Sequence, residues 1–227
     1  KGRKHGKWEV STPEGHLKYK GQFHHGTPVG EFRHFYPYKK LESVAVYSDS
    51  ARVVRVQRYY KNGNLQMEGK YVDKKMDSTW LLYNKKGLLV KQEYYNKGVP
   101  DSTWITYYSF NGKISEKVKY EDGKKQGDWI QFFADDTLKM RAHYENDTMH
   151  GEFLVNYPSG KVYKKGQYDR GFRTGTWLIL DENGDILKKV KYKNGFENVL
   201  IDNMPEEQQE EEDVQRDNSP AINPRPE

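Results

Sequence analysis

Histidine is the residue type in this chain whose placement most suggests chemistry, because imidazole binds metal ions and transfers protons near neutral pH. Five of the seven histidines lie within the first 34 residues: His5, His16, His24, His25 and His34. If the segments between them are extended, His16 and the His24–His25 pair lie about 23 Å apart, at opposite edges of a sheet. His5 then approaches only His25, and two imidazoles without a carboxylate make a weak metal site. We therefore interpret the histidines as surface residues and predict no metal site.

Catalytic motifs are missing from the sequence. It contains no G-x-S-x-G, no H-E-x-x-H, no P-loop and no G-x-G-x-x-G. It also lacks cysteine, which excludes disulfides, thiol nucleophiles and thiolate metal sites. No stretch approaches the roughly 18 apolar residues of a membrane-spanning helix. We predict that the protein is not an enzyme, needs no cofactor and has no small-molecule substrate.

Aromatic residues recur at a fixed period instead. The first series follows a Gly-x or Ser-x pair, and its members are separated by 24 residues, by 25 at one step and by 48 where Val56 replaces the ring: Trp8, Phe32, Trp80, Trp104, Trp129, Phe153 and Trp177. The second series has steps of 24, with a single step of 25: Phe23, Tyr47, Tyr71, Tyr95, Tyr120, Tyr144, Tyr168 and Tyr192. The two series agree on the period, which indicates eight repeats over roughly residues 6 to 196.

Each repeat has the pattern of a β-hairpin. In the third repeat Leu65, Met67, Gly69 and Tyr71 alternate with polar residues, a period of two that is typical of a half-buried strand. Asn62-Gly63 and similar pairs join the two strands, because Asn-Gly tolerates the positive φ angles of tight turns. We predict an all-β fold, an elongated single antiparallel meander of eight stacked 24-residue hairpin repeats with about 16 strands.

The aromatic series predict a core ladder rather than a stacking platform for bases or sugars, because the rings fall at the repeat period. We expect each Trp to lie beside the equivalent ring of the next repeat and each Tyr beside the next Tyr. The last repeat, Trp177 to Tyr192, would form a free sheet edge whose lysines block further stacking. We therefore expect a monomer.

Charge divides the chain into two parts. Between Asp202 and Glu227 there are nine acids and two arginines, whereas the whole chain has a net charge of +5, so the remainder carries +12. We predict a repeat domain at residues 1–200 and a disordered acidic tail at 201–227, which is rich in Glu, Gln and Pro.

Basic residues of the second strands are expected opposite the aromatic face, four of them in register as a cationic row. The candidates for binding an anionic partner are Lys117, Lys119, Lys139, Arg141, Lys165, Lys189 and Lys191. Such a row can meet lipid headgroups, an acidic protein or a polyanion. The alternative is a solvated sheet face whose lysines discourage aggregation, since acids such as Glu116, Glu145 and Asp169 are interleaved nearby.

Four segments carry the repeat motif in its fullest form: Gly127-Asp128-Trp129, Gly151-Glu152-Phe153, Gly175-Thr176-Trp177 and Gly166-Gln167-Tyr168. In these motifs the repeats resemble the bacterial variant of the MORN repeat. The sequence departs from the motif at Val56, Ser78 and Ser102. The resemblance implies a hairpin-repeat scaffold without catalytic residues, and some bacterial members carry an antitoxin-like label. Residues 1–8 resemble the first repeat of exported Bacteroidetes-type members, which implies a location in the periplasm or cell envelope, with the cytoplasm as the alternative.

These observations favour a protein that works by presenting a surface. The first hypothesis is a scaffold for interaction with another protein. The alternative is peripheral attachment to an anionic membrane or cell-envelope polymer through the basic sheet face.

Overall fold

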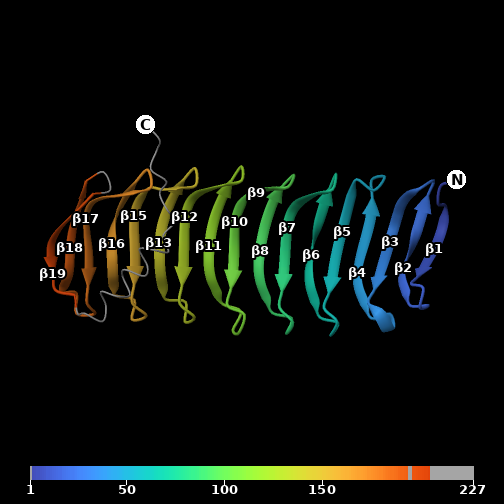
Figure 1. Ribbon diagram of the computed structural model, residues 1–227, viewed down its shortest axis with the longest axis horizontal. Helices are drawn as coiled ribbons and strands as arrows, with labels where there is room; N and C mark the ends of the chain where they lie inside the picture. Colours follow the sequence, from blue (N-terminus) through green and yellow to red (C-terminus); the bar gives the residue numbers. More distant parts are fainter. Residues whose placement is uncertain (1, 194–195, 205–227) are drawn as a thin grey trace. The chain divides into compact units, whose positions relative to one another are not determined.

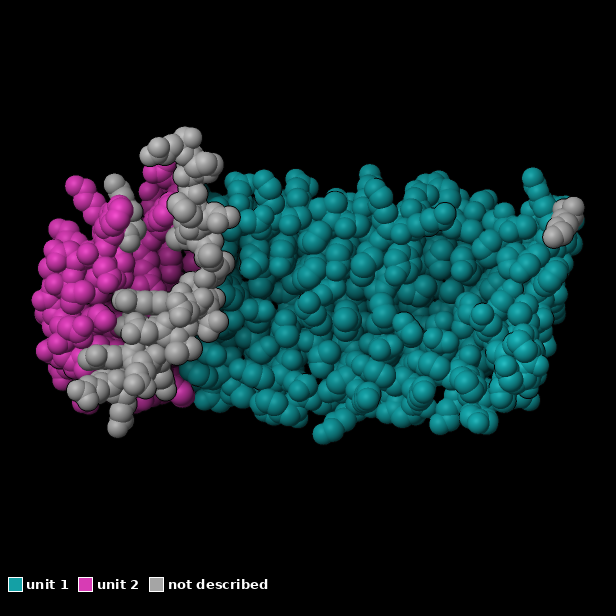
Figure 2. All heavy atoms as spheres, in the orientation of Figure 1, with its two compact units in different colours: residues 1–148 teal, residues 149–227 magenta. Residues whose placement is uncertain are grey.

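The computed structural model describes residues 2–193 and 196–204, and the chain divides into two compact units, residues 1–148 and 149–227 (Figures 1 and 2). The strands of the first unit are β1 (Gly6–Ser11), β2 (Leu17–His24), β3 (Thr27–Phe35), β4 (Leu41–Ser48), β5 (Val53–Tyr59), β6 (Leu65–Val72), β7 (Lys75–Tyr83), β8 (Leu89–Asn96), β9 (Val99–Pro100), β10 (Ser102–Tyr107), β11 (Ile114–Glu121), β12 (Lys124–Phe132) and β13 (Leu138–Glu145). A 3₁₀ turn, η1 (Pro37–Lys39), follows β3. The second unit holds β15 (Gly151–Asn156), β16 (Val162–Asp169), β17 (Phe172–Leu180), β18 (Ile186–Lys193) and β19 (Phe196–Asp202), and β14 (Thr148–Met149) lies at the division.

Within each unit, successive strands pair antiparallel, as the alternating arrows of Figure 1 show. Six hairpins, from β1–β2 to β12–β13, form the first unit, and two, β15–β16 and β17–β18, belong to the second. The predicted fold class, an all-β antiparallel meander of hairpin repeats, is therefore confirmed. The described residues contain no apolar helix of the length that crosses a membrane.

The hairpin turns use asparagine differently from the prediction. In the turn after β5, only Gly63 has a positive φ, 92°, whereas the side-chain oxygen of Asn62 accepts a hydrogen bond from the Asn64 N–H at 3.1 Å. The Asn62 side-chain amide also donates to the Lys85 carbonyl of the next repeat at 2.8 Å. Asn62 thus closes its own turn and links two repeats, and the glycine alone supplies the left-handed backbone.

The Gly-x-aromatic and Ser-x-aromatic pairs mark β-bulges between repeats. Ser78 and Ser102 have φ angles of 60° and 58°, and the β6–β7 register shifts between Glu68 and Lys70, opposite Ser78. The third repeat has Val54 at this position, and its β4–β5 pairing continues without a shift. A β-branched residue does not adopt positive φ at low cost, so the repeat that departs from the motif also lacks the bulge.

The last strand differs from the prediction. The described residues contain nineteen strands rather than sixteen, since β9 and β14 are short segments ahead of the bulged positions and β19 was not expected. Strand β19 pairs with β18 from Lys188↔Asp202 to Lys193↔Phe196, so the prediction that β18 is a free edge is wrong. Strand β19 also extends to Asp202, two residues beyond the expected end of the repeat domain at residue 200. Residues 205–227 of the predicted tail lie outside the described part of the chain.

Candidate functional site

One face of the sheet carries the aromatic ladder. Trp80, Phe32 and Trp177 are the most buried members of the first series, at 0%, 4% and 3% exposure, whereas Trp8 is 37% exposed. In the second series Tyr144 and Tyr192 are buried. The half-buried ladder residues are Phe23, Tyr47, Tyr71, Tyr95, Trp104, Tyr120, Trp129, Phe153 and Tyr168.

The rings alternate in type, contrary to the expected separate Trp and Tyr stacks. The Trp104 ring lies between Tyr95 and Tyr120, with centroids 5.2 and 4.8 Å away. Phe153 and Trp177, at 5.5 Å, are a pair that does follow the expected stacking of equivalent rings. Phe32, Trp80 and Trp177 show the cause of the alternation, because each of these rings lies over the glycine of the preceding strand and contacts the second-series ring of that strand.

Small residues beneath the rings make this packing possible. A Cβ placed on Gly69 would lie 2.2 Å from Cδ2 of Trp80, and one on Gly166 would lie 2.2 Å from Cδ2 of Trp177. The same position in the fourth repeat is Glu93, which is only 7% exposed. Its carboxylate contacts the Lys91 ammonium at 2.7 Å and accepts a hydrogen bond from the Tyr95 hydroxyl at 2.9 Å.

This buried polar cluster was missed by the sequence analysis, although Glu93 stands where other repeats have Gly, Ala or Val. Burial, and then the hydrogen bond to Glu93, raises the pKa of Tyr95 above its ordinary value. The Lys91 ammonium also lies 5.2 Å from the centre of the Trp104 ring. The buried Glu93 carboxylate is paired with both Lys91 and Tyr95, and we interpret the cluster as structural.

The opposite face holds the cationic candidates. In the first unit, Lys117 and Arg141 both pair with Ile130, so the three side chains share the face away from Trp129. In the second unit, Lys165 and Lys189 flank Leu178 in the same way. In each unit, two cations two strands apart, at about 9.6 Å, enclose an aliphatic side chain. None of these four cations forms an ion pair within the described residues.

The interleaved acids do not neutralise these cations. Glu116 turns to the aromatic side, where it accepts a hydrogen bond from the Trp129 indole at 2.7 Å. Asp169 contacts His150 at 3.6 Å and Arg170 at 3.4 Å. Lys119 lies two residues after Lys117 on β11 and pairs with Thr103. Lys191 lies two residues after Lys189 on β18 and pairs with Thr176, and both Lys119 and Lys191 are exposed.

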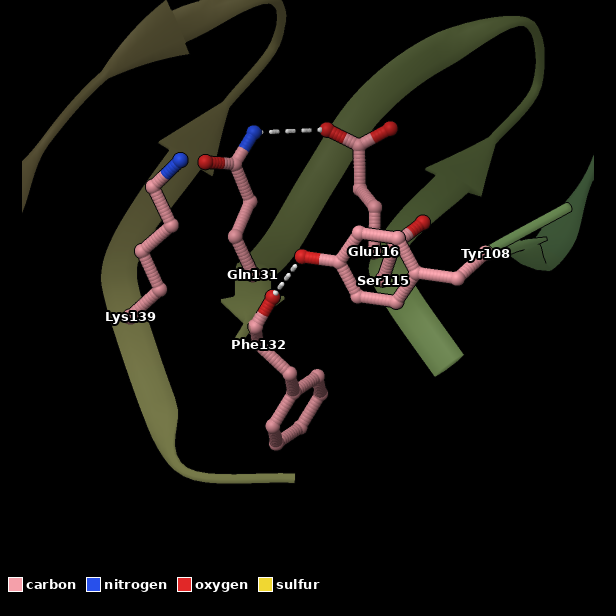
Figure 3. Close-up of a pocket in the computed structure, with 6 residues that line it drawn as sticks. All are labelled: Tyr108, Ser115, Glu116, Gln131, Phe132 and Lys139. Carbon is pink, nitrogen blue, oxygen red and sulfur yellow. Dashed lines mark hydrogen bonds between the residues drawn. The ribbon is translucent and has the colours of Figure 1, made fainter. Parts of the chain in front are cut away.

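Lys139 is placed apart from the other candidates. The β12–β13 register shifts between Gln131 and Phe132, opposite Lys139, so Lys139 is the extra residue of a bulge. Its ammonium group lies beside the Gln131 amide, in an open depression of about 230 Å³ (Figure 3). Tyr108 and Glu116 also line this depression, where the Tyr108 hydroxyl donates to the Phe132 carbonyl at 2.7 Å. The depression is shallow and its polar groups are largely engaged with one another, so it is a poor small-molecule site.

The histidines come closer together than predicted. His5 approaches His25 as expected, with ring centroids 4.8 Å apart, but His24 joins them at 5.4 Å from His5 and 4.5 Å from His25. His16 lies elsewhere, against the Tyr38 ring. Among the described residues, these three imidazoles are the side chains that lie close enough together to hold a metal ion.

Comparisons with known proteins agree with the repeat pattern. Residues 4–25, 52–73, 149–170 and 173–194 match the MORN repeat variant. None of the curated proteins matches the chain. Solved structures with some likeness include the crystal structure of TcdB2-TccC3, at 13% identity and a TM-score of 0.23 over 82% of this chain. Another is the Photorhabdus luminescens Tc holotoxin pore with the TccC3-D651A mutation, at 12% identity and a TM-score of 0.21 over 83%. This chain spans 13% of the length of each of those chains, and such scores carry no argument about function. The chain therefore contains MORN repeat variants, two in its first unit and two in its second.

Proposed function

We propose that this chain is a non-catalytic repeat scaffold that binds another protein through the sheet face opposite the aromatic ladder. The observation that carries the proposal is the arrangement of Lys117, Ile130 and Arg141 in one unit and of Lys165, Leu178 and Lys189 in the other. The cations lack ion-pair partners among the described residues, and the aliphatic side chains between them are only partly buried.

Such a face suits an acidic protein surface with apolar side chains of its own. The cations steer an acidic partner toward the face, and contact with the aliphatic side chains removes apolar area from water. A β-sheet also holds these side chains on a rigid backbone, so little backbone conformational entropy is lost on binding.

The alternative is attachment to an anionic membrane or cell-envelope polymer, favoured by the same cations, which form no ion pair within the described residues. The two mechanisms differ in their dependence on apolar contact. A polyanion or lipid headgroup binds through charge alone, so salt weakens it steeply, whereas a protein interface keeps its apolar contribution in salt.

One pair of variants separates these possibilities. The face variant combines Lys117→Glu and Arg141→Glu, and the control combines Lys85→Glu and Lys86→Glu, two exposed turn lysines, with the same change in net charge. We expect the wild type and the control to bind the same partner protein at low and at high salt, and we expect the face variant not to bind that partner. Identical capture by all three proteins would contradict the proposal.

Co-sedimentation with vesicles tests the alternative. Three results together would favour attachment to a membrane. The protein would bind vesicles that contain phosphatidylserine but not neutral vesicles, high salt would abolish this binding, and the face variant would not bind. We also propose, from the family resemblance alone, that the protein is exported from a bacterial cell. Fractionation of cells that produce the full-length gene product tests this location.

A further inference from the structure

We propose that His5, His24 and His25 form a binding site for a borderline divalent transition-metal ion such as Zn²⁺, Ni²⁺ or Cu²⁺. One potential ligand atom from each imidazole lies within 4.8 Å of the others, and all three side chains are exposed. In the described part of the chain, this is the one group of three or more His, Cys, Asp or Glu side chains close enough to share an ion.

The backbone holds the two contributing segments together. The Gly26 N–H donates a hydrogen bond to the Lys4 carbonyl at 2.7 Å, next to His5. His24 ends β2, which pairs with both β1 and β3, and His25 has a φ of 46° in the turn that follows. Neighbouring strand residues normally point to opposite faces, and the left-handed turn at His25 brings both imidazoles toward His5.

A structural role for His5 alone does not account for the cluster. Its Nδ1 accepts a hydrogen bond from the His25 N–H at 3.4 Å. The equivalent bond in the fourth repeat runs from the Lys97 N–H to the Asp77 carboxylate, also at 3.4 Å. In the sixth repeat it runs from the Asn146 N–H to the Gln126 amide oxygen at 2.9 Å. Any side-chain acceptor therefore closes this turn, and imidazoles at positions 24 and 25 are not needed for it.

The donor set determines the class of ion. Imidazole nitrogen suits Zn²⁺, Ni²⁺ and Cu²⁺, whereas Ca²⁺ and Mg²⁺ prefer oxygen ligands. With Zn–N bonds of about 2.0–2.1 Å, a tetrahedral ion holds its nitrogens about 3.4 Å apart, so the rings must close slightly from their present positions. Because all three side chains are exposed, rotation about their side-chain bonds achieves this without disturbing the core. The hydrogen bond from the His25 N–H to His5 Nδ1, which is weak at 3.4 Å, is the contact that breaks when the rings move.

The test is calorimetric titration of the full chain, free of any polyhistidine tag, with ZnCl₂. We expect one Zn²⁺ per chain and a melting temperature that rises with Zn²⁺, with no response to Ca²⁺ or Mg²⁺. His5→Ala, His24→Ala and His25→Ala should each lower the affinity by at least about 10-fold, because each removes one of three ligands. His16→Ala and His34→Ala serve as controls that keep the wild-type affinity. Circular dichroism without metal verifies that each variant is folded.

Two results would overturn the proposal. One is the absence of saturable one-site binding at millimolar Zn²⁺. The other is an affinity that stays the same in His24→Ala and in His25→Ala, which would assign the ion to another place. With Cu²⁺ as the probe, nitrogen hyperfine splitting in the electron paramagnetic resonance spectrum should diminish in each of the three variants and persist in both controls.

Discussion

At the scale of single residues, the aromatic ladder depends on what lies beneath each ring. Trp80 is fully buried because Gly69 leaves room for its indole, and Ala45 faces the smaller Val56 one repeat earlier. At these two sites the ring size and the size of the residue below are matched, whereas Trp104 lies over the larger Glu93 and is only half-buried.

We predict that Gly69→Ala destabilises the protein by about 1–3 kcal/mol, because the new methyl group overlaps the Trp80 indole. In a Trp80→Val background the same change should be neutral or slightly stabilising, since alanine loses less backbone entropy on folding than glycine. Urea unfolding of the four proteins in this double-mutant cycle measures the coupling. Equal costs in both backgrounds would show that the ring does not press on Gly69.

Asp77 gives the fold a dependence on pH. The hydrogen bond and ion pair with Lys70, at 3.0 Å, lower the pKa of the Asp77 carboxyl, with smaller contributions from Ser78 and the Lys97 N–H. A lowered pKa in the folded state stabilises the protein above the unfolded pKa of about 3.9, and this stabilisation is lost as the pH falls through the folded value.

Asp77→Asn should therefore lower the melting temperature at pH 7, and the difference from wild type should shrink as the pH falls from 5 toward 2. Thermal unfolding of both proteins across this range provides the measurement. A difference that does not vary with pH would mean that the carboxylate charge contributes nothing.

At the scale of the elements, tyrosine hydroxyls connect successive hairpins. Tyr36, Tyr60, Tyr108 and Tyr157 each donate a hydrogen bond to a carbonyl of the next repeat, at 3.0, 2.9, 2.7 and 2.8 Å. Their spacing follows the 24-residue period, so the sequence contained this signal and the analysis of the two main series overlooked it.

Replacing Tyr108 by Phe should cost about 0.5–1.5 kcal/mol, because it removes the hydroxyl and leaves the half-buried Phe132 carbonyl without this donor. Tyr38→Phe is the matched control, since Tyr38 is 82% exposed on the turn after β3. Chemical denaturation compares the two variants with wild type. An equal effect of both changes would rule out a specific role for the Tyr108 hydroxyl.

At the scale of the whole molecule, each strand within a unit contacts mainly the strands next to it along the chain, which is the behaviour of a quasi-one-dimensional protein. Removing a complete repeat should therefore be tolerated. Deletion of residues 74–97 removes β7 and β8 and joins Asp73 to Gly98, the same dipeptide that forms the natural Asp122-Gly123 turn. It also places Gly69 in the position of Glu93, beneath Trp104.

We expect this deletion variant to unfold cooperatively, with a strand content per residue close to that of wild type by circular dichroism. Deletion of residues 86–97 is the control, because it removes β8 alone and leaves the next strand in the wrong direction for antiparallel pairing. The prediction would be contradicted if the control unfolded cooperatively, or if the full-repeat deletion variant did not unfold cooperatively.

The sequence by itself determined the hairpin repeats. Alternation with a period of two and turns such as Asn62-Gly63 are local signals, and their recurrence over 24 residues specified which strands are neighbours. It also placed Lys117 and Arg141 in one row, because residues one period apart occupy equivalent positions. Whether that row binds an anionic partner stays a prediction.

Only the tertiary structure decided what depends on bulges, turns and partners distant in the sequence. A bulge placed Lys139 in a depression, apart from the other cationic candidates, and pairing with β18 made a strand of Phe196–Asp202, which lacks the repeat motif. The positive φ of His25 brought His24 and His25 together with His5. The positive φ at His25 and the bulge at Lys139 recur at the same place in other repeats, but alternation and turn residues show neither of them, and β19 depends on a partner strand rather than on the motif.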